Sequence, residues 1–122
     1  MTGFSVHLEQ LPGCDVATPR GDLDVFSSGR LRSVVFDPAS CAQDVLVVDL
    51  SDVTFIDSTG LGVLVATRRW TRARSAELVL VVRPGSVVAR VLTVAGLHVV
   101  FTTVSTRDEA VPDLERPALA GH

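Results

Sequence analysis

The 122-residue chain contains no lysine, no tyrosine and no asparagine. The absence of lysine excludes several kinds of catalytic and phosphate-binding site. Without lysine there is no Schiff-base nucleophile, no phosphate-loop lysine and no lysine general base. Without asparagine, helix caps and tight turns must be supplied mainly by serine, threonine and aspartate. All 11 basic residues are arginines, yet the net charge is −3. This balance does not suit a general nucleic-acid binder.

Long apolar runs and an N-terminal export signal are also missing. Residues 1–10 have neither the basic flank nor the apolar segment of a signal peptide. No run approaches the roughly 18 apolar residues of a membrane span. Cys14 and Cys41 lack metal-binding spacing, and in a chain without an export signal they predict reduced thiols; a disulfide between them is the less favoured alternative. We therefore expect one cytoplasmic domain with no metal, cofactor or membrane partner.

Hydrophobic patterning predicts an α/β fold with a small mixed sheet. Alternation over residues 4–10, a turn at 11–13 and a weaker run over 14–18 predict an antiparallel N-terminal hairpin. The continuous apolar runs 45–50 and 78–82 are typical of buried strands with parallel neighbours. A last short strand is expected over 99–103, and loops are expected over 19–22 and 51–56.

Helices are expected between these strands. The first begins at Asp24 or a neighbour, ends near Asp37, and has Val25 on its inward face. The others are predicted over 58–74, 87–95 and 106–114. Packed helices on a mixed sheet make a single domain over residues 4–112, followed by a flexible tail over 113–122.

The helix expected from Ser58 changes along its length. Its first half, residues 61–66, is apolar nearly all round, which predicts cover on more than one side. A partner could supply part of that cover. Four arginines between 68 and 74 suit the negative end of the helix dipole. Gly60 and Gly62 would each cost about 1 kcal/mol relative to alanine inside a helix. Either the sheet or another protein is therefore expected to approach the backbone closely there.

Ser58 stands where a strand and loop lead into a helix N-terminus, which carries unpaired N–H groups and about half a positive charge. Its hydroxyl could cap the helix, a role worth about 1 kcal/mol. It could instead carry a phosphate, because a helix N-terminus stabilises a dianion. Asp57 could share the cap, and Thr59 could take the phosphate. Both interpretations stay open on the residues alone.

Three motifs resemble one family. Residues 47–62, Val-Val-Asp-Leu-Ser-Asp-Val-Thr-Phe-Ile-Asp-Ser-Thr-Gly-Leu-Gly, are similar to the signature of STAS domains, and more narrowly to that of bacterial anti-sigma factor antagonists. Gly-Asp-Leu-Asp at 21–24 and Val-Ala-Gly-Leu at 94–97 resemble two further family motifs. The resemblance spans residues 4–110 and implies a STAS-like fold whose central helix begins at a phosphorylatable serine.

The resemblance implies partner switching rather than enzymatic activity. An unmodified antagonist binds an anti-sigma factor that is also a serine kinase, and this frees a sigma factor. The kinase then phosphorylates the serine matching Ser58, with Thr59 as the alternative acceptor, and a serine phosphatase restores binding. ATP and magnesium belong to the kinase, so no cofactor, metal or catalytic residue is implied for this chain. The implied partner-binding residues are Asp24, Asp57, Ser58, Thr59, Gly60, Leu61 and Gly62.

Three other functions each fit part of the sequence. A STAS scaffold or sensor module would lack the phosphorylation switch, and stable self-association without a kinase partner would favour it. The domain could also form a weak homodimer. A phosphoacceptor receiver domain is suggested by Asp49 at a strand end, but it requires a lysine that the chain lacks. A hydrolase is disfavoured because His7, His98 and His122 are scattered and no paired nucleophile and base appear.

Overall fold

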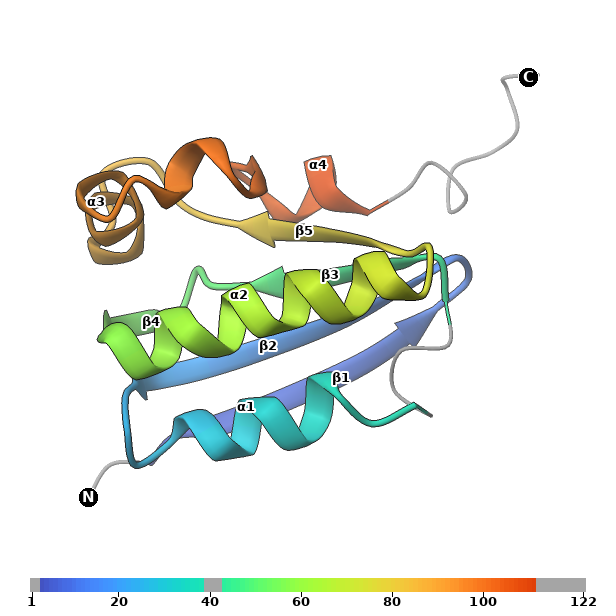
Figure 1. Ribbon diagram of the computed structural model, residues 1–122, viewed down its shortest axis with the longest axis horizontal. Coiled ribbons are helices and arrows are strands. Elements are labelled where there is room, and N and C mark those ends of the chain that lie inside the picture. The colour runs from blue at the N-terminus through green and yellow to red at the C-terminus, as the bar shows by residue number, and fades with distance from the viewer. Residues whose placement is uncertain (1–2, 39–42, 112–122) are drawn as a thin grey trace.

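The computed structural model describes residues 3–38 and 43–111. Within these residues the chain forms a mixed sheet with helices on both faces (Figure 1). The strands are β1 Ser5–Leu11, β2 Cys14–Leu23, β3 Val45–Asp49, β4 Val53–Ile56, β5 Glu77–Val81 and β6 Thr102–Val104. The helices are α1 Ser28–Val35, α2 Ser58–Ala73, α3 Val87–Val94, the 3-10 turn η1 Leu97–Val99 and α4 Arg107–Ala110.

The sheet combines one antiparallel pair with parallel neighbours. Strands β1 and β2 form the predicted hairpin, and the turn between them uses a positive φ of 85° at Gly13. Strands β2, β3, β5 and β6 follow in parallel, in the order β1-β2-β3-β5-β6. The central strands β3 and β5 are almost completely buried, as their continuous apolar sequences predict. The predicted mixed α/β fold is confirmed.

Two predicted loops are strands instead. Strand β2 continues through residues 19–22, and residues 53–56 form β4 rather than a linker. The pairing of β2 with β3 ends at Ala17, and β4 takes over from Gly21 onwards. Pro19, which cannot donate to a ladder, falls in the gap between these two parallel pairings. Gly21 has φ of +105° at the register shift between the two parts, a backbone conformation that favours glycine.

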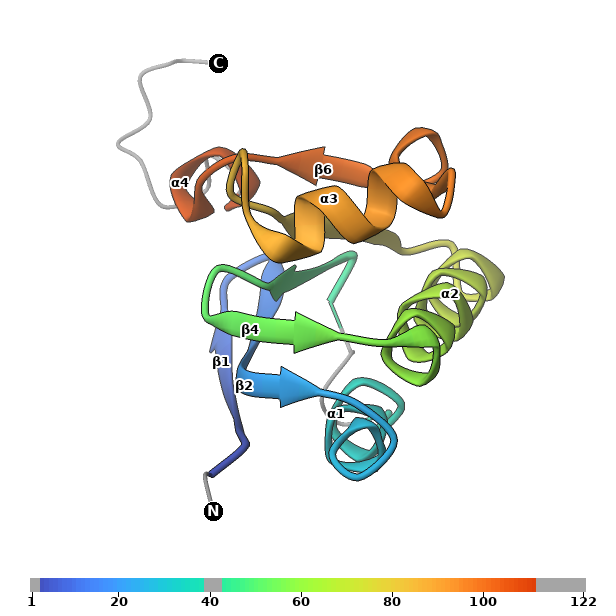
Figure 2. The same cartoon turned by 90° about the vertical axis from the view of Figure 1, so that its left-hand side faces the viewer.

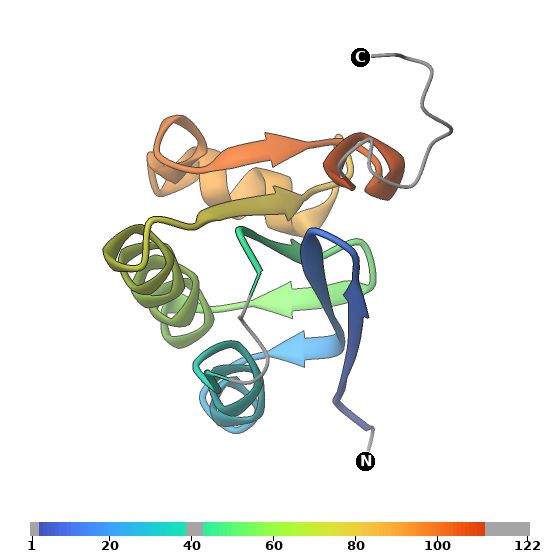
Figure 3. The ribbon, with the colours of Figure 1, turned by 90° about the vertical axis from the view of Figure 1, so that its right-hand side faces the viewer.

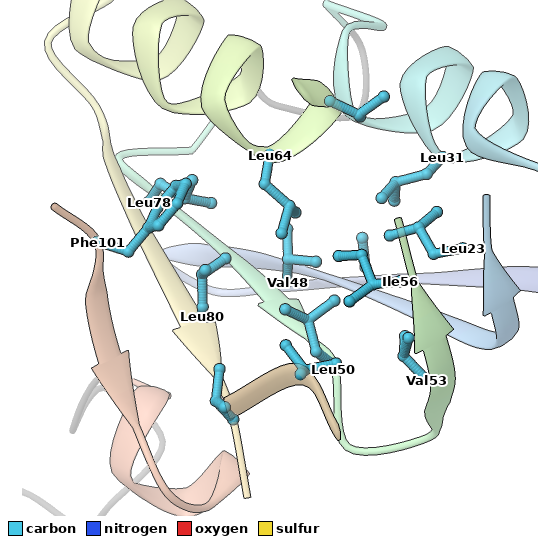
Figure 4. Close-up of a cluster of buried hydrophobic side chains, with 14 of the residues drawn as sticks. Leu23, Leu31, Val48, Leu50, Val53, Ile56, Leu64, Leu78, Leu80 and Phe101 are labelled. Atoms are coloured by element: carbon cyan, nitrogen blue, oxygen red, sulfur yellow. The ribbon is translucent and has the colours of Figure 1, made fainter. Parts of the chain in front are cut away.

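Apolar side chains on the two faces of the sheet form two cores. Helices α1 and α2 cover one face, where Leu64 packs over Val48 and Leu31 packs beside Leu23 (Figure 4). Helix α4 lies on the opposite face, where Ala110 joins a smaller cluster built from Cys14, Val16, Val47, Val79 and Val81 (Figure 3). This burial is the main stabilising contribution to the fold.

The helix ends use the serine, threonine and glycine signals of the sequence. The Ser86 hydroxyl accepts a hydrogen bond from the N–H of Ala89 at 3.2 Å, and Gly96 has φ of 74° just after α3. Thr106 and Glu109 form a capping box that begins α4.

The last strand begins at Thr102 and not at Val99 as predicted, because residues 97–99 form η1. Helix α4 ends at Ala110 and Val111 is extended, so the terminal helix is shorter than the predicted 106–114. The predicted tail over 113–122 and Cys41 lie outside the described residues.

Within the two described ranges, no helix combines the length and the apolar character needed to cross a membrane.

Candidate functional site

The residues singled out by the sequence meet at the end of the molecule where β2 and β4 finish and α1 and α2 begin (Figure 2). The N–H of Asp57 donates to the carbonyl oxygen of Leu23 at 3.3 Å. This bond holds the start of α2 against the end of β2, so Asp24 follows directly beside the first turn of α2. The structure therefore brings the 21–24 motif and the 57–62 motif together.

Asp57, not Ser58, caps α2. Asp57 has extended backbone angles, φ of −114° and ψ of −173°, and its Oδ1 accepts a hydrogen bond from the N–H of Gly60 at 3.0 Å. Ser58 is the first residue of the helix and is exposed. The hydroxyl of Ser58 forms no side-chain hydrogen bond with other described residues. The interpretation of Ser58 as the N-cap is therefore wrong, and its hydroxyl remains accessible beside the positive end of the helix dipole.

Gly60 and Gly62, in the first two turns of α2, differ in the space available for a side chain. A Cβ on Gly60 would lie 2.6 Å from the carbonyl oxygen of Leu23 and 2.9 Å from Cγ1 of Ile56. Gly60 is thus required by close packing on the domain's own sheet. A Cβ on Gly62 would meet nothing within 4 Å, and Gly62 is exposed. The packing of the domain itself therefore gives no reason for glycine at position 62.

Asp24 shapes the loop that leads from β2 into α1. Its Oδ1 accepts hydrogen bonds from the N–H groups of Phe26 at 2.9 Å and Ser27 at 3.1 Å. Because this turn occupies residues 24–27, α1 begins only at Ser28. The expected inward position of Val25 is therefore wrong: Val25 is 60% exposed.

Sequence reasoning missed an exposed apolar group at this same end. Phe26 is 91% exposed and Phe55, on β4, is 46% exposed. Such large apolar side chains at the surface often mark a binding site. The signal that could have found Phe26 is the pair Asp24 and Ser27, whose spacing favours a side-chain-capped turn instead of a helix.

Several carboxylates lie on or directly next to β2, β4 and the turn after β2, the segments that carry these apolar side chains. Asp22 is exposed and accepts a hydrogen bond from the Thr54 hydroxyl at 2.6 Å, and a groove beside it is lined by Asp22, Asp24, Phe26 and Arg30. The Nε of Arg20 lies 3.5 Å from Oδ2 of Asp52, so the two side chains form an ion pair. Both are exposed to solvent, and the ion pair therefore contributes little stability. With Asp24 and Asp57, this end of the molecule carries more acidic than basic groups. A further negative charge on Ser58 would add to that excess.

Residues 5–110 match the model of the STAS domain family. The chain belongs to the STAS domain family. It is 31% identical over 99 residues to the anti-sigma-F factor antagonist RsfB of Mycobacterium tuberculosis, a match that covers 81% of this chain and 80% of RsfB. It is also 38% identical over 60 residues to the anti-sigma-B factor antagonist of Bacillus subtilis, covering 49% of this chain and 54% of that protein.

The fold agrees with this family. An anti-sigma factor antagonist from Mycobacterium paratuberculosis, solved as a crystal structure, matches with a TM-score of 0.78 and 26% identity, covering 88% of this chain and 91% of that chain. The resemblance to STAS domains and to anti-sigma factor antagonists is thereby confirmed. The members of this group are regulatory binding proteins rather than enzymes, as predicted for this STAS domain.

Proposed function

We propose that this STAS domain binds an anti-sigma factor serine kinase in its unphosphorylated form, frees a sigma factor, and is switched off by phosphorylation of Ser58. A serine phosphatase acting on the phosphorylated form would reverse the switch, all in the cytoplasm. The observation that carries the proposal is the accessible Ser58 hydroxyl at the start of α2, released from a capping role by Asp57. The name of the relative RsfB, an anti-sigma-F factor antagonist, supports an anti-sigma factor as the class of partner.

The surface around Ser58 has the composition of a protein interface. Ser58, Thr59 and Gly62 present an exposed, small-residue edge of α2, onto which a partner backbone can pack closely. Phe26 stands nearby as an exposed aromatic side chain, and aromatic residues supply much of the binding energy at interfaces. Leu61 is half-buried against the core, so its role is to support this edge as well as to contact a partner.

A phosphate on Ser58 would change this surface without refolding it. It adds about −1.5 to −2 charges at neutral pH. In the free domain the N-terminus of α2 stabilises that charge. In a complex the same charge would be confined together with Asp24 and Asp57, away from water, where like charges are costly. The modified domain is therefore expected to stay folded and to release its partner.

Affinity capture from host lysate tests the proposal. The wild-type chain, a Ser58→Asp variant and a Ser33→Asp control would be immobilised, and retained proteins identified by mass spectrometry. Ser33 is an exposed serine on α1, so the control adds the same charge elsewhere. We expect wild type and the control to retain an ATP-binding serine kinase that Ser58→Asp loses. If all three retain the same proteins, or only copies of this chain, the phosphorylation switch is wrong and a scaffold function replaces it.

Truncation of Phe26 is expected to weaken partner binding without affecting the fold. Because its side chain is 91% exposed, Phe26→Ala should change the free energy of unfolding by less than about 0.5 kcal/mol. The affinity for the captured kinase should fall about tenfold or more, the usual cost of removing an aromatic anchor. Calorimetric titration with Val99→Ala as control, another apolar side chain that is 77% exposed, checks this. If Phe26→Ala and Val99→Ala lose the same amount of affinity, Phe26 is not part of the interface.

A further inference from the structure

The end of α2 opposite Ser58 forms a second chemically distinct surface, here called the basic end. It lies where the C-terminal parts of α1 and α2 run side by side (Figure 3). The basic end consists of Arg32 and Phe36 from α1 with Arg69, Trp70, Arg72 and Arg74 from α2 and its C-terminus. The four arginines are exposed, and the two aromatic side chains are half-buried.

The aromatic rings order two of these arginines. Phe36 and Trp70 meet edge to face, with their ring centres 5.4 Å apart and an angle of 61° between the rings. The guanidinium of Arg32 lies 4.8 Å from the centre of the Phe36 ring, and that of Arg74 lies 4.7 Å from the centre of Trp70. Stacking restricts both side chains, so less entropy is lost when they bind an anion.

Among residues 3–38 and 43–111, no arginine of the basic end forms an ion pair with a carboxylate. The ion pairs among the described residues are Arg20–Asp52 and Arg107–Glu9, and neither involves the basic end. Helix α2 contains no acidic residue, so it has no opposite-charge pair at the usual spacing of three or four. Arg69 and Arg72 are instead like-charged neighbours on one face, an arrangement that slightly destabilises a helix. An ordinary solvated helix face mixes both signs.

The chemistry of the basic end selects one class of ligand. Guanidinium groups bind both carboxylates and phosphates through paired N–H donors. Arginines already cover a face of each ring, which leaves less of the aromatic surface on which nucleic-acid bases could stack. We propose that the basic end is a second docking surface that binds an acidic segment of a protein partner.

This surface is separate from the one around Ser58. Eleven residue steps lie between Ser58 and Arg69, which at about 1.5 Å per residue is about 16 Å along the helix. A partner at the basic end therefore leaves the start of α2 accessible. Two proteins could be held on α2 at once, and the basic end should bind acidic segments whether or not Ser58 carries a negative charge.

Trp70 makes the proposal directly measurable, because it is the only tryptophan of a chain without tyrosine. Its fluorescence would be followed during titration with a short poly-glutamate peptide, a poly-lysine peptide and a single-stranded DNA oligonucleotide. We expect a saturable change with poly-glutamate only, weakened by salt. Arg69→Glu should weaken that binding about tenfold. Arg90→Glu, the same charge change at an exposed position on α3, should alter it less than about twofold.

The design separates this proposal from the function proposed above. Ser58→Asp should bind poly-glutamate as wild type does, and the unfolding midpoint of Arg69→Glu should match that of Arg90→Glu. Absence of a saturable signal, equal weakening by both charge reversals, or tighter binding of the oligonucleotide would each overturn the proposal. A Trp70 signal that depends on protein concentration alone, and that Arg69→Glu abolishes, would show that a second copy of this chain occupies the surface, which also overturns it.

Discussion

Phosphorylation of Ser58 is expected to weaken binding of the anti-sigma factor kinase several hundredfold. The phosphate would bring about two negative charges into the proposed interface, which would already contain Asp24 and Asp57. Confining these like charges away from water should cost about 3–4 kcal/mol, and each 1.4 kcal/mol corresponds to about a tenfold change in affinity. Calorimetric titration of the purified kinase with the two forms of the chain measures the difference.

The mechanism requires that the phosphorylated domain remain folded. Its thermal unfolding midpoint should equal or slightly exceed that of the unmodified chain, because the phosphate lies at the positive end of α2. Phosphoserine placed at position 33 is the matched control and should leave the affinity nearly unchanged. A loss of binding that accompanies unfolding, or an affinity that falls less than about tenfold, would contradict the electrostatic switch.

Gly60→Ala is expected to destabilise the fold by about 2–3 kcal/mol. The new methyl group would lie 2.6 Å from the Leu23 carbonyl oxygen and 2.9 Å from Cγ1 of Ile56, so the start of α2 must move away from β2. The Leu23 carbonyl also accepts the hydrogen bond from the N–H of Asp57, which that movement would strain. The gain of about 1 kcal/mol in helix propensity offsets only part of this cost.

Gly62→Ala is the matched control, two positions further along the same helix. Nothing lies within 4 Å of its Cβ position, so the substitution should stabilise the free domain by about 0.5–1 kcal/mol. Denaturant unfolding of both variants measures the contrast. If both alanines destabilise the domain equally, Gly60 is not the residue on which the packing of α2 depends. If Gly62→Ala also weakens kinase binding, position 62 belongs to the interface.

Much of the fold could be predicted from local patterns. Alternation in β1, continuous apolar runs in β3 and β5, and the apolar stretch of α2 each depend on residues close together in the chain. Strand β4 was missed because its sequence, Val53–Ile56, is short and follows a polar segment. It becomes a strand only because the far end of β2 is left without β3 as a neighbour. Long-range pairing of that kind has no local signal.

The sequence by itself determined the mixed α/β class, the STAS motifs and the position of Ser58 at a helix start, because these depend on residue type and spacing. The tertiary structure decided which residue caps α2, why Gly60 and Gly62 differ, and that Phe26 is exposed. Each of these depends on the distance between atoms that the chain brings together from separate segments. Leu23 shows the reason most clearly: its carbonyl oxygen excludes a side chain at position 60 and also positions Asp57, which leaves the Ser58 hydroxyl accessible.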